Sequence, residues 1–238
     1  LSISKGIDML SNGADVLDIG GESSKPPSIY GHVDKVAADE EIQRIVPVIR
    51  ALSLESETII SVDTYKAKVA KAAISAGATM VNDIWGLRRD PEMVQLIAAT
   101  GVYVVIMHNA ESAQYKDIVK NNVEFLKKRV GFAISSGIET HKIIVDPGIG
   151  FGKGSEQNLQ ILNRLDEYKT IGVPIMVGTS RKSTIGEILE LPVDDRIEGT
   201  AATVSVAITR GADMVRVHDV PEMHRIAKMT DAIVRGGA

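Results

Sequence analysis

Cysteine is absent from the chain, positive charge is not in excess, and no long apolar run occurs. Without cysteine the protein can form neither a disulfide nor a thiolate metal site, which fits a reducing compartment, and we expect a cytoplasmic location. The 27 Lys and Arg against 31 Asp and Glu give a net charge of −4 and a pI of about 5.8, so nothing favours a nucleic-acid partner. No stretch approaches the ~20 apolar residues of a membrane helix, and no signal peptide is recognisable, so we expect no membrane partner.

The composition is that of an ordinary globular protein. Of the 238 residues, 44% are hydrophobic and 24% are charged. A chain of this length buries about 70–75% of its unfolded surface and needs no covalent cross-links. The length suits one large domain or two small ones, and α/β barrels commonly have this size. We expect a single domain over residues 1–238.

Glycines mark a repeating unit along the chain. Each of six glycines follows a helix-like stretch and precedes an apolar run: Gly13, Gly77, Gly101, Gly137, Gly172 and Gly211. Glycine just past a helix end is a stop signal because it tolerates left-handed backbone. Seven strands are predicted, at Val16–Gly20, Thr58–Val62, Met80–Ile84, Val102–Met107, Ile143–Val145, Pro174–Val177 and Met214–Val217. Their nearly continuous apolar character is typical of parallel strands that are buried on both faces.

Helical patterns fill the gaps between these strands. Apolar residues recur at helical spacing in an opening helix (Ile3, Ile7, Leu10), a long central helix (Val119, Val123, Leu126, Val130) and a last helix (Ile226, Met229, Ile233). Strand–helix alternation indicates βα units, and seven of them predict an α/β protein with a TIM (β/α)8 barrel whose first strand is missing from the sequence. The chain starts without Met, inside a helix, so we expect that strand to precede residue 1. An open doubly wound sheet is the alternative.

In such a barrel the active site lies at the carboxyl ends of the strands, and every predicted strand ends in polar residues. They are Asp18, Gly20, Gly21, Glu22, Asp63, Thr64, Asn82, Asp83, His108, Asn109, Asp146, Ser180, Arg181, Lys182, Arg216, His218 and Asp219. Singly, each has a structural explanation. Asp63-Thr64 and Asn82-Asp83 are also typical of helix caps, Asp146-Pro147-Gly148 of a turn, and a lone histidine of a hydrogen-bonded core residue.

Together, the strand ends predict a site for a flat heterocycle that carries an anionic group. Asp63, Asn82 and Asp146 offer the acceptors and the amide donor that suit an amino-pyrimidinone edge, to which Lys182 adds a donor. The segment 178–183, Gly-Thr-Ser-Arg-Lys-Ser, combines backbone N–H groups, an ammonium and a guanidinium, which suit a phosphate or carboxylate. Arg216 and His218 form a second basic strand end. The glycine-rich segment 148–153 fits neither the P-loop nor the dinucleotide pattern.

Six blocks resemble the dihydropteroate synthase family, in the family's order and across nearly the whole chain. They are Asp18-Ile19-Gly20-Gly21-Glu22-Ser23, Ser61-Val62-Asp63-Thr64, Val81-Asn82-Asp83-Ile84, Asp146-Pro147-Gly148-Ile149-Gly150-Phe151, Gly178-Thr179-Ser180-Arg181-Lys182-Ser183 and Arg216-Val217-His218. The resemblance implies a (β/α)8 barrel and a transferase of folate biosynthesis. Such an enzyme condenses 4-aminobenzoate with a dihydropterin methyl diphosphate, giving dihydropteroate and pyrophosphate.

The resemblance also implies roles for individual residues. The pterin would be held by Asp63, Asn82, Met107, Asp146, Phe151, Gly178 and Lys182; 4-aminobenzoate by Ser24, Lys25, Lys182 and Ser183; and the diphosphate, with Mg²⁺, by Arg216 and His218. Lys182, Arg216, His218 and Asp63 would be the catalytic residues. The implied partners are these small molecules and a second copy of the chain in a homodimer. The family is also a sulfonamide target.

The chain departs from the family pattern at two places that matter here. The family's opening strand, which supplies an Asn near the metal, is absent, so no metal ligand is assigned. Lys25 stands where the family usually has Arg, and lysine lacks the bidentate geometry of a guanidinium. Three alternative interpretations of the function remain: a pterin-binding methyltransferase domain acting on a corrinoid, a non-catalytic pterin-binding barrel, and an unrelated phosphate-sugar enzyme.

Overall fold

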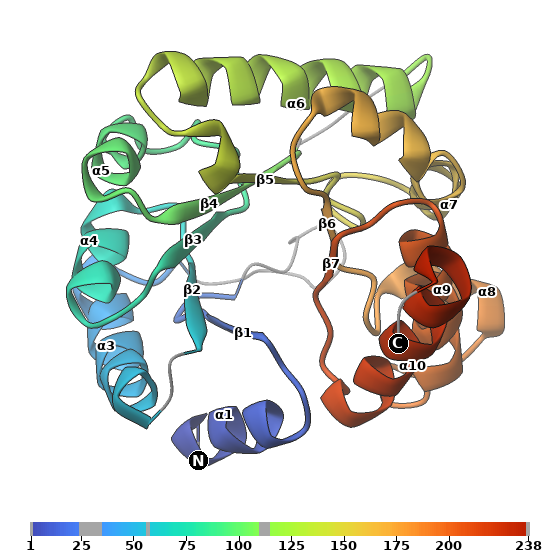
Figure 1. The fold of residues 1–238 in the computed structure, drawn as a ribbon, viewed down its shortest axis with the longest axis horizontal. Coiled ribbons are helices and arrows are strands. Elements are labelled where there is room, and N and C mark those ends of the chain that lie inside the picture. Colours follow the sequence, from blue (N-terminus) through green and yellow to red (C-terminus); the bar gives the residue numbers. More distant parts are fainter. Residues whose placement is uncertain (1, 24–34, 56–57, 110–114, 237–238) are drawn as a thin grey trace.

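Seven parallel strands follow one another around a central axis, with helices outside them (Figure 1). The computed structural model describes residues 2–23, 35–55, 58–109 and 115–236. The strands are β1 (Val16–Ile19), β2 (Ile59–Asp63), β3 (Met80–Asp83), β4 (Tyr103–Met107), β5 (Ile143–Asp146), β6 (Met176–Val177) and β7 (Met214–Val215). All seven strands predicted from the sequence are present, with ends that differ by a residue or two.

The strand order distinguishes a barrel from a doubly wound sheet. Strands β1 to β5 pair in sequence order, a parallel bridge between Val145 and Ile175 continues the ring to β6, and β6 pairs with β7. A doubly wound sheet reverses its order at a switch point, and no reversal occurs among these strands. A cavity of about 720 Å³ lies between the two edge strands, β1 and β7, and reaches Met80, Val105 and Met176 in the barrel interior. An eighth strand preceding residue 1 stays a prediction.

Helices connect the strands and cover the outside of the barrel. They are α1 (Ser2–Ser11), α3 (Ala38–Glu55), α4 (Ala67–Ser75), α5 (Glu92–Thr100), α6 (Ile118–Ser135), α7 (Ser155–Asn163), α8 (Ser183–Leu189), α9 (Ile197–Thr209) and α10 (Val220–Arg235), with 3-10 turns at Thr140–Lys142 and Leu165–Ile171. The six glycines predicted to end helices all have positive φ, between 67° and 117°. These glycines therefore determine where the strands begin, and so also the level in the barrel at which the strands end.

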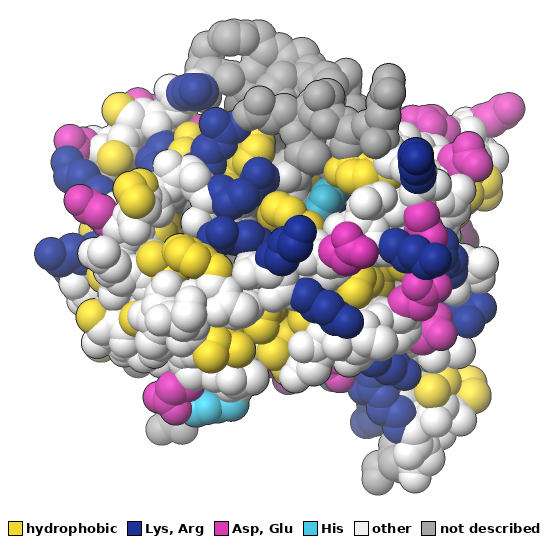
Figure 2. All heavy atoms as spheres, turned by 90° about the horizontal axis from the view of Figure 1, so that it is seen from above, with side chains coloured by type: hydrophobic (Ala, Val, Ile, Leu, Met, Phe, Trp, Pro, Cys, Tyr) yellow, Lys and Arg dark blue, Asp and Glu magenta, His cyan; other side chains and the backbone are white. Residues whose placement is uncertain are grey.

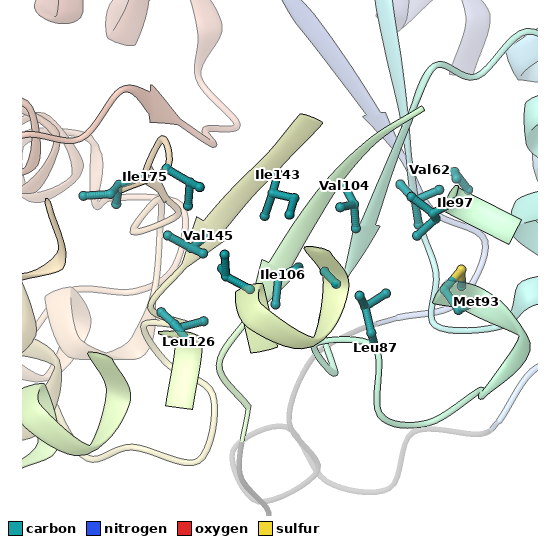
Figure 3. Close-up of a cluster of buried hydrophobic side chains, with 14 of the residues drawn as sticks. Val62, Leu87, Met93, Ile97, Val104, Ile106, Leu126, Ile143, Val145 and Ile175 are labelled. Carbon is teal, nitrogen blue, oxygen red and sulfur yellow. The ribbon is translucent and has the colours of Figure 1, made fainter. Parts of the chain in front are cut away.

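The main core lies between the strands and the surrounding helices. Val62, Val104 and Ile106 point from the strands toward Ile97 of α5 and Leu126 of α6 (Figure 3). A smaller cluster inside the barrel contains Met80, Val105, Ile144 and Met176. Alternate residues of a strand point to opposite faces, so the strands contribute side chains to both clusters. This explains why the strands are apolar throughout.

Helical periodicity identified apolar faces that the structure leaves partly exposed. In α1, Ile3 and Ile7 are 37% and 41% exposed, and in α10, Met229 and Ile233 are 62% and 71% exposed. By contrast, α6 buries Val119, Val123, Leu126 and Val130 as predicted, and its outer side carries Lys and Arg among hydrophobic side chains (Figure 2). None of the helices in the described ranges is both long and apolar enough to cross a membrane.

Candidate active site

A small cavity at the carboxyl ends of the strands collects most of the residues singled out in the sequence. It is lined by Asp63, Asn82, Ile84, Met107, Asp146, Phe151, Gly178, Ser180, Lys182, Arg216 and His218. These residues come from six strand ends, β2 to β7, or from the turns just after them. All seven residues expected around the pterin are therefore brought together. Asn82, Arg216 and His218 also line the larger cavity between β1 and β7.

Arg216 lies at the centre of a cluster of carboxylates. Its Nε donates to Asp18 Oδ2 at 2.6 Å, and its Nη2 donates to Asp63 Oδ2 at 3.2 Å. The same Asp18 oxygen accepts from Asn82 Nδ2 at 3.1 Å. The register places the three strand residues on one face of the sheet, because Asp18 pairs with Ser61, two residues before Asp63 on β2, and Asp63 pairs with Asn82 on β3. Hydrogen bonds between charged groups are the strong ones, so this cluster fixes the guanidinium beside the cavity.

Lys182 and Asp146 both line the small cavity beside the turn after β5. Lys182 Nζ donates to the carbonyl oxygen of Ile149 and lies 4.9 Å from the centre of the Phe151 ring. Asp146 Oδ1 accepts from Gly148 N at 2.7 Å. A lysine, a carboxylate and an aromatic face thus converge at one point, an arrangement that suits a planar, polar ring.

His218 and Ser180 form the anion-facing rim. The Nδ1 atom of His218 lies 2.9 Å from Ser180 Oγ, which also accepts from the His218 backbone N–H at 3.2 Å. Arg181 differs from the expectation that its guanidinium joins the anion site. It donates to Asp219 through Nε at 3.0 Å and to Asp194 through Nη1 at 3.2 Å, and it does not line the small cavity. Acidic partners on the rim therefore hold its charge away from the site.

Burial shifts the protonation of several groups in the site. It raises the pKa of Asp63, and the neighbouring Asp18 raises it further, while Arg216 opposes the rise. Burial also raises the pKa of Asp146, whereas the positive charge of Lys182 lowers it. It lowers the pKa of Lys182 to about 8, although Asp146 favours the charged form. Burial, followed by repulsion from Arg216, lowers the pKa of His218. Perturbed groups of both signs in one cavity are typical of a functional site.

The ordinary structural explanations hold for some strand-end residues and not for others. Asp83 accepts from the backbone N–H groups of Trp85 and Leu87 and is a turn residue. His108 is a buried core residue whose ring packs edge-on against Phe125 at 4.8 Å. Asp63, however, does not cap α4, where Asp90 accepts from the Ala67 N–H at 2.8 Å instead. Asp146 serves both as a turn residue and as a wall of the cavity.

Three residues expected near 4-aminobenzoate have different outcomes. Ser24 and Lys25 lie outside the described residues. Ser183 begins α8, next to Lys182, but is not among the residues that line the small cavity. Asp18 was singled out as a strand-end residue, but its partner was not predicted. It ends an apolar strand like the other site residues, but no motif indicated that it holds Arg216.

Divalent metal ions in proteins are commonly held by carboxylate or imidazole groups. Within the described ranges, no three His, Asp or Glu side chains are grouped so that they could hold a metal ion. The side chains of the described residues therefore do not by themselves form a metal cage. Asp18 Oδ1 and Asn82 Oδ1, which are buried and have no hydrogen-bond partner among the described residues, are available acceptors near the site.

The fold and site define a class: parallel α/β barrels that bind a polar ring and an anionic group at the carboxyl ends of their strands. Residues 2–218 match the family model described as pterin binding enzyme, so the chain belongs to this family, on its dihydropteroate synthase branch. The chain is 48% identical over 229 residues to a dihydropteroate synthase of Clostridium beijerinckii, with 96% of this chain and 83% of that protein covered. It is 44% identical over 230 residues to one of Bacillus subtilis, with 97% and 79% covered.

Solved structures agree. A dihydropteroate synthase from Clostridium difficile, crystallised with pteroic acid, has a TM-score of 0.93 and 48% identity, with 98% of this chain and 87% of that chain covered. A dihydropteroate synthase from Xanthomonas albilineans in complex with 7,8-dihydropteroate has a TM-score of 0.89 and 36% identity, with 97% and 83% covered. The expected barrel and the expected family are both confirmed.

Proposed function

We propose that this chain is a dihydropteroate synthase, a transferase that joins 4-aminobenzoate to (7,8-dihydropterin-6-yl)methyl diphosphate. One observation carries the proposal. A single cavity is lined by the acceptors Asp63, Asn82 and Asp146 and by the cations Lys182 and Arg216, in a chain whose relatives bear this name. Two solved relatives were crystallised with pteroic acid and with 7,8-dihydropteroate. We propose residues 1–238 as one pterin-binding domain.

In this proposal the pterin occupies the acidic end of the cavity. The amino-pyrimidinone edge donates to Asp146 and Asp63 and exchanges hydrogen bonds with the Asn82 amide. Lys182 donates to the ring carbonyl or a ring nitrogen. The Phe151 ring, Met107 and Gly178 provide flat, close contact for the rest of the ring, and all three line the cavity.

The diphosphate lies toward Arg216 and His218. As the C–O bond between the pterin methylene and the diphosphate breaks, the bonding electron pair leaves with the diphosphate, and nearby cations stabilise that developing negative charge. The methylene carbon becomes electron-poor beside the carboxylates of Asp63 and Asp146. The aniline nitrogen of 4-aminobenzoate then forms the new C–N bond and loses a proton. No covalent enzyme intermediate is needed.

For 4-aminobenzoate the proposal involves Ser24, Lys25, Ser183 and the shared Lys182. Of the two that the structure describes, Lys182 lines the small cavity and Ser183 does not. Lys182 directly precedes Ser183, the first residue of α8, so we infer that the two residues serve a substrate entering beside the pterin.

We propose Mg²⁺ as a companion of the diphosphate. Mg²⁺ is usually held by one or two carboxylates together with substrate phosphates and water, which agrees with the lack of a protein-only cage among the described residues. A homodimer, a cytoplasmic location and inhibition by sulfonamides are further parts of the proposal. A dihydropteroate synthase of Yersinia pestis has been solved with a sulfonamide drug.

The test is release of pyrophosphate from the dihydropterin methyl diphosphate, with and without 4-aminobenzoate, over a titration of Mg²⁺. Release that depends on 4-aminobenzoate supports the synthase, and its loss on chelation supports the metal. Pterin binding without release would support a non-catalytic barrel instead. Binding of a corrinoid would favour a pterin-binding methyltransferase domain and overturn the proposal.

A further inference from the structure

Lys153 is a buried lysine that the proposed reaction does not use. The residue is 7% exposed. Its Nζ donates to three backbone carbonyl oxygens: Gly148 at 2.7 Å, Phe151 at 2.9 Å and His108 at 3.2 Å. An ammonium has three N–H donors, so every donor of Lys153 is committed to backbone. A buried charge is expensive unless it is fully hydrogen-bonded, so a lysine in this place requires a reason.

The three carbonyls belong to two segments that must meet closely. His108 follows β4, whereas Gly148 and Phe151 belong to the turn after β5. At Gly148 an added Cβ would lie 1.9 Å from the His108 carbonyl oxygen, and its φ is +69°. Three carbonyl oxygens that point to one place repel one another, and a cation between them removes that repulsion. Burial lowers the pKa of Lys153 to about 7, whereas the negative charge of Asp146 favours the charged form, as do hydrogen bonds to three carbonyl acceptors.

The turn that Lys153 holds carries three contacts of the site. The Ile149 carbonyl accepts from Lys182 Nζ, the Phe151 ring lies 4.9 Å from that same nitrogen, and the Gly148 N–H donates to Asp146 at 2.7 Å. On the far side of the turn, Asn158 Oδ1 accepts from the Gly150 N–H at 2.9 Å. The position of the turn therefore determines where Lys182 and Phe151 lie.

We propose that Lys153 is a positioning residue for the pterin: its ammonium ties the turn after β5 to the end of β4 and so places Lys182, Phe151 and Asp146 for binding. This inference rests on the proposed function for the identity of the ligand. It concerns binding rather than chemistry, because Lys153 does not line the small cavity and contacts the site only through backbone groups.

The test compares Lys153→Met with Lys128→Met, a control at an exposed position on the outer helix α6. Methionine keeps the length and apolar stem of lysine but leaves three buried carbonyls without a donor. We expect Lys153→Met to raise the dissociation constant of pteroic acid, measured by calorimetry, and the KM for the pterin diphosphate, each by about tenfold or more. Lys128→Met should change neither.

Two readouts separate positioning from a general loss of folding. A smaller folded fraction lowers apparent kcat and leaves the KM and the dissociation constant per active site unchanged. A double-mutant cycle is the second readout. If Lys153 acts through Lys182, then adding Lys153→Met to Lys182→Met should weaken binding much less than it does in the wild type. If Lys153→Met does not fold, Lys153→Gln, which keeps two N–H donors, replaces it.

A pteroic acid dissociation constant within twofold of the wild type in a folded Lys153 variant overturns the inference, as does full additivity in the cycle. The proposed function fails differently, through a wild-type protein that binds pteroic acid but releases no pyrophosphate. Calorimetry with pteroic acid measures the effect of the Lys153 variants on binding whether or not the wild type releases pyrophosphate.

Discussion

Arg216 and Asp18 lie 198 residues apart in the chain and are joined by a hydrogen bond of 2.6 Å from Nε to Oδ2. The bond links β1 to the segment after β7, which are the two edges of the ring of strands among the described residues. A second hydrogen bond runs from Nη2 of Arg216 to Asp63, and both residues line the small cavity. Asp18 therefore sets the direction from which Arg216 meets an anion.

Replacing Asp18 with Asn should lower kcat/KM for the pterin diphosphate by about 10- to 100-fold. The charged partner of Arg216 is lost, and a hydrogen bond to a charged group contributes about 1.5–3 kcal/mol. Steady-state kinetics with both substrates would measure the effect. Asp15→Asn, at the exposed opposite end of the same strand segment, is the matched control. Equal kinetics in the two variants would show that Asp18 does not orient Arg216.

Arg216→Ala should reduce turnover more than pterin affinity. The guanidinium is proposed to interact most strongly with the diphosphate as negative charge develops on it, and an interaction that strengthens in the transition state acts on kcat. We expect a fall in kcat of at least about 100-fold, with a change of only a few-fold in the pteroic acid dissociation constant. An unchanged kcat would refute the role of Arg216 toward the leaving group.

Asp146→Asn should weaken pterin binding by about 10- to 100-fold. Asp146 accepts a hydrogen bond from the Gly148 N–H at 2.7 Å, and the amide oxygen of Asn could still accept it. The amide NH2 would then face the pterin, where an acceptor is required, and a buried mismatched donor costs about 1–3 kcal/mol. Calorimetry with pteroic acid would measure the loss. Asp195→Asn, on an exposed loop, should bind like the wild type.

The sequence predicted the strands and most of the residues around the cavity because both depend on local signals. Glycines at helix ends and continuous apolar runs locate the strands, and a barrel brings the polar residues after them to one level. Partnerships across the chain have no such signal. The hydrogen bonds of Asp18 with Arg216 and of Arg181 with Asp219 depend on side-chain directions that only the three-dimensional arrangement of the strands defines.

Burial was predicted poorly where it depends on neighbours rather than on residue type. Lys153 lies in a glycine-rich segment that matches no phosphate motif, and only the approach of His108 to Gly148 creates the place for its ammonium. Conversely, Met229 and Ile233 follow helical spacing but remain exposed in α10. Periodicity shows that a helix has an apolar face, but it does not show what covers that face.

Asp63→Asn should abolish most activity and yet stabilise the fold at alkaline pH. Burial and Asp18 raise the pKa of Asp63 from 3.8 to about 7. Between these two values the native state keeps a proton that the unfolded state has released, so native stability falls as pH rises through this range, and above it Asp63 is a carboxylate in both states. Asparagine removes that dependence. We expect the Tm of the variant to exceed that of the wild type by a few degrees at pH 8 and by less at pH 5.

Calorimetric scans at the two pH values would test this expectation, with Asp195→Asn as a control that shifts neither. A variant that is less stable than the wild type at pH 8 would mean that the bond from Arg216 to Asp63 outweighs the burial of the carboxylate.

Gly148→Ala and Gly131→Ala should change stability in opposite directions. The Cβ at position 148 would lie 1.9 Å from the His108 carbonyl oxygen, on backbone with φ of +69°, so either the turn or the end of β4 must move. Strain and overpacking together should destabilise the protein by about 2–4 kcal/mol. At position 131, inside α6, nothing lies within 4 Å of an added Cβ, and alanine should stabilise the helix by about 1 kcal/mol. Urea unfolding would measure both, and a Gly148→Ala protein with wild-type stability and pterin affinity would show that the close contact between the two segments does not hold the site in place.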